Sequence, residues 1–177
     1  MKPGQMLLSV YLAAAMRVAA DAQEPQVSKG PLMTEFGRVA SVDGAEKLPV
    51  DTEFKVAFDV MIAGETGKVN RRLESAARFL NMHAAAGVPV ENLDIAIVVH
   101  GPAVQDLTSD ARYGSDNANA ELIAALQAHG VSFQMCGQSA AFRGVKAADL
   151  LPGVKMSLSA MTAHALLQQQ GYTLNPF

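Results

Sequence analysis

Cys136, the only cysteine in this chain of 177 residues, has the clearest potential for covalent chemistry. It directly follows a short apolar run, Val131–Met135, and precedes a segment at about 138–142 that is predicted to be helical. The sulfur is therefore expected near a helix N-terminus, where unpaired backbone N–H groups and the helix dipole stabilise a thiolate. This placement favours a reactive thiol. The alternative is a small buried apolar residue that closes the strand, the common role of an isolated cysteine.

His100 is the second residue with potential for chemistry, because it ends another apolar run, Leu93–Val99, and precedes the turn residues Gly101 and Pro102. At the end of a neighbouring strand, its imidazole would approach the same sheet edge as Cys136, and a base beside a thiol activates it. The alternative is a histidine that hydrogen-bonds a backbone group in the turn. No acidic partner for a Cys–His pair can be named from spacing, which gives a thiol protease little support.

The other three histidines, His83, His129 and His164, lie inside or at the ends of predicted amphipathic helices and are expected to be packing or surface residues. The histidines and the cysteine show no zinc-ligand spacing, and one cysteine cannot form an internal disulfide. The segment 64–68 (GETGK) has two residues between its glycines where a phosphate-binding loop has four, and no dinucleotide fingerprint is present. We therefore expect neither a metal nor a cofactor.

The composition points to one globular domain without affinity for nucleic acid. The length is near the usual domain size, and half of the residues are hydrophobic (50%). With 14 basic and 17 acidic residues, the formal net charge is −3 and there is no basic cluster to attract phosphates.

Strand-like and helix-like segments alternate along the chain from residue 53 onward. Strands are predicted at 53–62, 93–99 and 131–135, with a further possible strand at 154–158; helices are predicted from Asn70, from about Ala118, at about 138–142, and up to Gly171. This order predicts an α/β fold with a mainly parallel sheet flanked by helices on both faces. The last helix is expected to bury a stripe formed by Leu158, Met161, Thr162, Ala165 and Leu166.

The carboxyl ends of the strands are where such sheets collect ligands and reactive groups. Two predicted loops leave the sheet there, one after the second strand and one after the third. We expect Gly101, Gly137 and Gln138 to line a pocket at this edge together with His100 and Cys136.

The N-terminal segment has the shape of a signal peptide. Lys2 is followed by an apolar stretch that is too short for a membrane span, and Ala20 and Ala22 form an A-x-A cleavage site. We therefore predict a signal peptide at 1–22, an irregular arm at 23–52, rich in Gly and Pro, and an α/β domain at 53–177. Export would place the protein in the periplasm or outside the cell. The alternative is an amphipathic N-terminal helix on a cytoplasmic protein, which Arg17 favours.

Several segments together resemble the DsrE/DsrF-like family, most closely its exported single-domain branch. The resemblance is carried by the segments FKVAFDV at 54–60, IVVHG at 97–101, ALQAHGVSFQMCG at 125–137 and LLPGV at 150–154. It implies a DsrE-like α/β sheet and assembly into a homo-oligomer (trimer or hexamer). In the sulfur-relay branch, a cysteine at the end of the third strand carries persulfide sulfur, and by position that cysteine is Cys136.

Two functional hypotheses follow. The first is a sulfur-handling protein, a sulfur carrier or sulfurtransferase-like enzyme, in which Cys136 takes persulfide sulfur and passes it on in a thiol relay. Its partner would be a thiol-bearing protein or a small sulfur donor. The second is a noncatalytic oligomeric binding module that uses the loops after strands two and three. Neither hypothesis includes a nucleic acid, or a membrane span once the signal peptide is removed.

Overall fold

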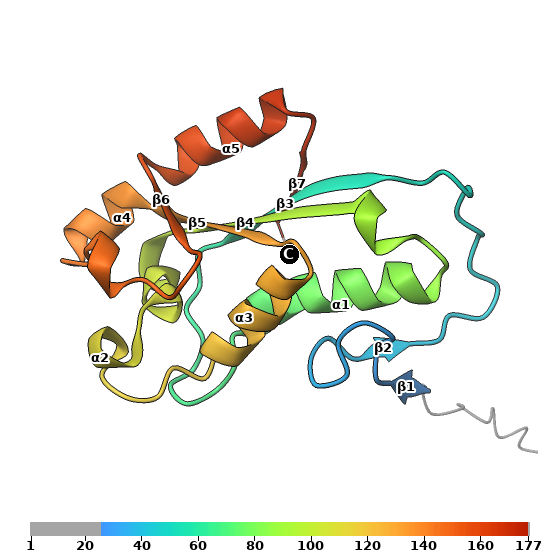
Figure 1. The fold of residues 1–177 in the computed structure, drawn as a ribbon, viewed down its shortest axis with the longest axis horizontal. Helices are drawn as coiled ribbons and strands as arrows, with labels where there is room; N and C mark the ends of the chain where they lie inside the picture. Colours follow the sequence, from blue (N-terminus) through green and yellow to red (C-terminus); the bar gives the residue numbers. More distant parts are fainter. Residues whose placement is uncertain (1–25, 177) are drawn as a thin grey trace, which may run out of the picture.

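A five-stranded parallel sheet, with strand order β6-β5-β4-β3-β7, forms the centre of the computed structural model (Figure 1). The structure describes residues 26–176. The strands are β3 (Phe54–Val60), β4 (Leu93–Val99), β5 (Ser132–Cys136), β6 (Lys155–Ser157) and β7 (Thr173–Asn175). Every neighbouring pair is parallel, so the predicted α/β class is confirmed. Strand β7 was not predicted, because its three residues lack an apolar pattern.

Helices cover both faces of this sheet, as predicted. The α-helices are α1 (Arg71–Ala85), α2 (Asp110–Tyr113), α3 (Ala120–Ala128), α4 (Gly137–Phe142) and α5 (Ala160–Gln169), with short 3-10 helices at Val90–Asn92, Gly101–Leu107 and Ala147–Asp149. Figure 1 shows α1 and α3 on one face and α5 on the opposite face. Asn70 begins α1 as predicted, since its side chain accepts a hydrogen bond from the backbone N–H of Arg72.

The two faces of the sheet differ in the size of their side chains. Because successive residues of a strand point to opposite faces, β3 and β4 divide into two sets. The larger residues pack against α1 and α3, among them Val56, Phe58, Val60, Ile95, Ile97 and Val99. The smaller set, Ala57, Ala96 and Val98, faces α5 and packs with Cys136 of β5 and with Ala160, Ala163 and Leu167.

The buried stripe of α5 differs from the predicted one. The predicted stripe is largely exposed, with Met161 at 79% and Leu166 at 52%. Two apolar stripes on this helix share the same spacing, and periodicity alone cannot choose between them. The alanine-rich stripe packs inward because it opposes the small residues of the sheet, and the bulky side chains are left on the open side.

The N-terminal arm is more ordered than its Gly- and Pro-rich sequence suggests. It contains a short antiparallel pair, β1 (Val27–Ser28) and β2 (Val39–Ala40). The predicted signal peptide at 1–22 lies outside the described residues. Between residues 26 and 176, no helix is both long enough and apolar enough to span a membrane.

Several side chains of α1 hold the arm to the domain, and the completely buried Asn81 makes most of the hydrogen bonds. Its Oδ1 accepts hydrogen bonds from the backbone N–H groups of Leu32 and Met33, at 3.1 and 2.9 Å. Its Nδ2 lies 3.0 Å from three carbonyl oxygens, those of Met33, Phe36 and Gly37. A single amide group thus satisfies the backbone of a loop that has little regular structure of its own.

Candidate functional site

The register of the sheet places His100 beside Cys136. Val99 of β4 is paired with Met135 of β5, so the next positions of the two strands are His100 and Cys136. The backbone of His100 is still extended (φ −144°, ψ −177°), and adjacent strands lie about 4.8 Å apart. The two side chains therefore neighbour each other on the face of the sheet that α5 covers.

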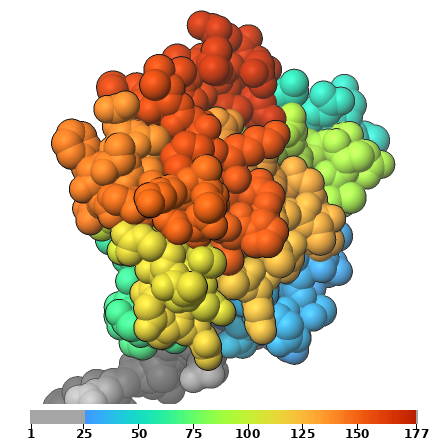
Figure 2. All heavy atoms as spheres, turned by 60° about the vertical axis from the view of Figure 1, so that its left-hand side comes forward, coloured from blue at the N-terminus to red at the C-terminus, as the bar shows by residue number. Residues whose placement is uncertain are grey.

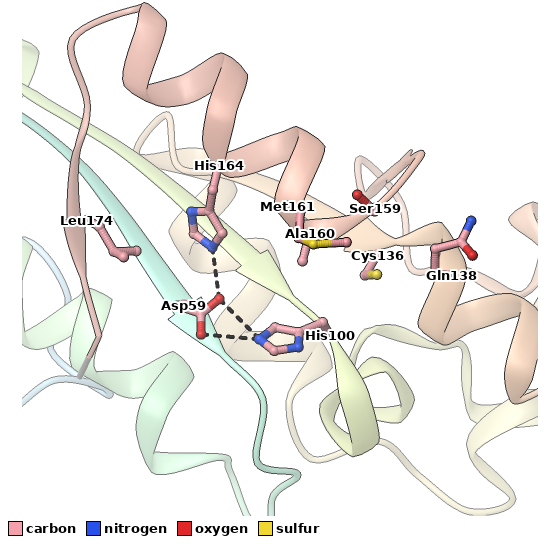
Figure 3. A pocket seen from close by; sticks show the side chains of 9 residues that line it. All are labelled: Asp59, His100, Cys136, Gln138, Ser159, Ala160, Met161, His164 and Leu174. Carbon is pink, nitrogen blue, oxygen red and sulfur yellow. Dashed lines mark hydrogen bonds and ion pairs between the residues drawn. The ribbon is translucent and has the colours of Figure 1, made fainter.

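A pocket of about 460 Å³ lies between these strand ends and α5 (Figure 3). It is lined by Asp59, His100, Cys136, Gln138, Ser159, Ala160, Met161, His164 and Leu174. Figure 2 turns this end of the molecule towards the viewer and shows α4, β6 and α5, in orange to red, adjoining over much of it. Of the residues expected at the pocket, His100, Cys136 and Gln138 line it, whereas Gly101 and Gly137 do not.

Cys136 is the N-cap residue of α4, and only 5% of its surface is exposed. Burial raises the pKa of its thiol, but hydrogen bonds from the Ser139 side chain and from the backbone N–H groups of Ser139, Ala160 and Gln138 outweigh burial and lower the pKa below its ordinary value. The backbone N–H of Ser139 lies 3.5 Å from Sγ. The site therefore stabilises a thiolate by local hydrogen bonds.

The two glycines act through their backbones. Gly101 adopts φ +56°, in the left-handed region that favours glycine, and its N–H donates to Oγ of Ser139 at 2.9 Å. This bond joins the 3-10 helix after β4 to α4, the helix that Cys136 caps. A Cβ on Gly137 would lie 2.5 Å from the carbonyl oxygen of Ser157, so the close approach of α4 to β6 requires glycine.

Asp59 binds two imidazoles in the same pocket (Figure 3). Nε2 of His100 lies 3.1 Å from both carboxylate oxygens, and Nε2 of His164 lies 2.8 Å from Oδ1. Burial raises the pKa of Asp59, but the hydrogen bonds from His100 and His164 and their electrostatic attraction outweigh burial, and the net pKa is lowered. The carboxyl group is therefore ionised at neutral pH.

The prediction for His164 was wrong. This residue was expected to be a packing or surface residue of the last helix, but it lines the pocket and binds Asp59. Asp59 is also the acidic partner that spacing could not identify. One signal was available: Asp59 is a charged residue near the end of a strand that is apolar from Val56 to Phe58, and it lies on the face opposite Phe58 and Val60.

The remaining histidines lie elsewhere. His83 is a packing residue as predicted, with its ring against Phe54 and Phe79 and its Nδ1 2.8 Å from the carbonyl oxygen of Phe79. His129 follows the end of α3 and does not line the pocket. Within the described part of the chain, no group of three or more His, Cys, Asp or Glu side chains has the geometry to hold a metal ion.

The fold and the site together define a class of α/β proteins in which a single cysteine ends a central parallel strand beside a small pocket. The chain belongs to the DsrE/DsrF-like family, whose model matches residues 55–176. The family assignment predicted from the sequence is thereby confirmed.

Two solved structures share the fold. One is MTH1491, a protein of unknown function from Methanobacterium thermoautotrophicum, with a TM-score of 0.55 and 22% identity over 71% of this chain and 100% of that chain. The other is the ychN protein from E. coli, with a TM-score of 0.53 and 18% identity over 70% of this chain and 99% of that one. No curated protein matches the sequence.

Proposed function

We propose that this protein carries sulfane sulfur as a persulfide on Cys136 and passes it to a second thiol. The observation that carries the proposal is a thiol whose pKa is lowered by local hydrogen bonds and which lines a pocket large enough for a small donor. Sulfur exchange depends on the thiolate fraction and on access to the sulfur. Membership of a family associated with sulfur relay supports the same chemistry.

The step itself needs neither metal nor organic cofactor. The thiolate of Cys136 attacks the outer sulfur of a persulfide and forms a new S–S bond. The donor leaves as a thiol, and Cys136 holds the sulfur as Cys–S–SH. Attack on that outer sulfur by an acceptor thiol regenerates Cys136.

The proposal extends to location and assembly. We expect export to the periplasm or beyond after cleavage behind Ala22, as in the exported single-domain branch, and a trimeric or hexameric homo-oligomer. The acceptor would be a thiol-bearing protein in the same compartment. Expression of the full chain in a bacterium, followed by fractionation and size measurement, tests both points. A protein that stays in the cytoplasm and keeps residues 1–22 would contradict export.

Intact mass measurement after treatment with a sulfane-sulfur donor tests the central step. We expect a gain of one sulfur, about 32 Da, that is lost on reduction and is absent from the Cys136→Ala variant. The same spectrum reports the mature N-terminus. No gain in the folded protein, together with slow alkylation of the thiol, would refute the proposal.

A noncatalytic binding module is the second candidate, and the low exposure of Cys136 favours it. The apolar residues Ala160, Met161 and Leu174 in the pocket wall suit a small organic ligand. In this case Cys136→Ser leaves both assembly and ligand binding intact. Loss of the oligomer in this variant would argue against the binding module.

A further inference from the structure

Four side chains lie in a row across the C-terminal edge of the sheet. Cys136 on β5 is next to His100 on β4, His100 binds Asp59 on β3, and Asp59 binds His164 on α5. An ionised carboxylate can only accept hydrogen bonds. Both Nε2 atoms are therefore donors, and the carboxylate fixes the tautomer and the orientation of both rings.

The two imidazoles have different surroundings. Nδ1 of His164 is buried and has no hydrogen-bond partner among the described residues. A proton on that atom would be buried without an acceptor, which is unfavourable. His100 is the more exposed side chain, at 26% against 15%, and it is the one beside the thiol. Of the two imidazoles, His100 is therefore the one placed to exchange a proton with a ligand in the pocket.

The pocket lining also discriminates between sulfur donors. It contains one carboxylate and neither lysine nor arginine. A dianionic donor such as thiosulfate, which releases sulfite, would meet both the Asp59 carboxylate and the Cys136 thiolate, and the single charge of a His100 imidazolium would not balance them. An organic thiol finds apolar contacts in Ala160, Met161 and Leu174.

We propose that the pocket takes the hydropersulfide of a small organic thiol and that His100, as imidazolium, protonates the thiolate that leaves. This inference rests on the proposed function of Cys136. His100 is a catalytic residue in this scheme, whereas Asp59 and His164 are positioning residues that act through it.

The step balances in atoms and charge. The thiolate of Cys136 attacks the outer sulfur of R–S–SH, one S–S bond forms and one breaks, and no net oxidation occurs. The proton of the His100 imidazolium passes to R–S⁻. The products are Cys–S–SH, R–SH and neutral imidazole, which water reprotonates.

The dependence of the rate on the leaving group tests this inference. Sulfur loading of Cys136 is timed with an alkyl hydropersulfide, whose thiolate is strongly basic, and an aryl hydropersulfide, whose thiolate is weakly basic. His100→Gln should slow the alkyl donor by about 100-fold, the lower range for a general acid, and the aryl donor much less. Asp59→Asn and His164→Gln should slow the alkyl donor selectively but to a smaller extent.

The controls remove like groups outside the pocket. His129→Gln and Asp43→Asn, at positions that do not line it, should leave both rates unchanged. If His100→Gln slows sulfur loading equally with both donors, His100 has a structural role and the inference is overturned. Asp59→Asn provides the same test should His100→Gln fail to fold.

The outcomes also distinguish failure of this inference from failure of the proposed persulfide carrying. Normal loading in every variant would overturn the proton-donor role of His100 and leave persulfide carrying intact. Faster loading of the unmodified protein by thiosulfate than by the alkyl donor would overturn the substrate class alone. Loading by no donor at all would refute the proposed function itself, and this inference with it.

Discussion

Replacing Asn81 with leucine should detach the N-terminal arm from the domain. Asn81→Leu keeps a similar volume but removes about four hydrogen bonds: two accepted by Oδ1, and two from the Nδ2 protons, which three carbonyl oxygens share. A typical intramolecular hydrogen bond contributes about 1 kcal/mol net, so the loss amounts to about 4 kcal/mol. Since 1.4 kcal/mol is a factor of ten, the protection of the Leu32 and Met33 amides should fall by about a thousandfold.

Hydrogen exchange measured residue by residue is the suitable assay, because the arm can open locally while the sheet stays folded. Asn92→Leu is the matched control, since its side chain makes one hydrogen bond, from Nδ2 to the carbonyl oxygen of Thr52 at 3.2 Å. Asn92→Leu should lower the local free energy of opening around Thr52 by about 1 kcal/mol. Equal losses in the two variants, or unchanged exchange at Leu32 and Met33, would refute the view that Asn81 holds the arm.

Three further predictions concern the loops and the core. Gly137→Ala should lower the free energy of unfolding by about 1–3 kcal/mol in urea titrations, because the new Cβ meets the Ser157 carbonyl at 2.5 Å; an unchanged midpoint would show that α4 shifts freely. Ser139→Ala should move the alkylation midpoint of Cys136 to higher pH, because the Ser139 side-chain hydrogen bond helps lower that pKa; no shift would remove Ser139 from thiolate stabilisation. Burial raises the pKa of Asp106 above 3.8. The unmodified protein should therefore lose free energy of unfolding, relative to Asp106→Asn, as the pH rises from the unfolded-state pKa of this carboxyl through its raised folded-state pKa. Urea titrations that give the same pH dependence for both proteins over this range would contradict this prediction.

Local patterns in the sequence were sufficient to locate the main strands. The run at 93–99 forms β4 with the predicted bounds, because it is apolar except at Asp94 and is bounded by turn residues. The first and third strands end within two residues of their predicted ends. Cys136 and His100 could be placed at one edge because the carboxyl ends of parallel strands share it.

The rest of the site depends on contacts that local patterns do not encode. Asp59 and His164 are 105 residues apart in sequence, and only the packing of α5 over the sheet brings them together. The orientation of α5 depends on the small side chains beneath it, Ala57 and Ala96, which belong to other elements. Periodicity within the helix therefore identified a helix but not its buried side.

Helix α5 runs from β6, at one edge of the sheet, to β7, at the other. In a chain growing on the ribosome, β3, β4 and β5 are complete while this helix is still unmade, so Asp59 has only one of its two imidazoles and the pocket lacks a wall. The thiol of Cys136 then has no backbone N–H from Ala160 to stabilise its charge. The hydrogen bond from Ala160, which helps to lower the pKa of Cys136, is thus acquired only among the last steps of synthesis.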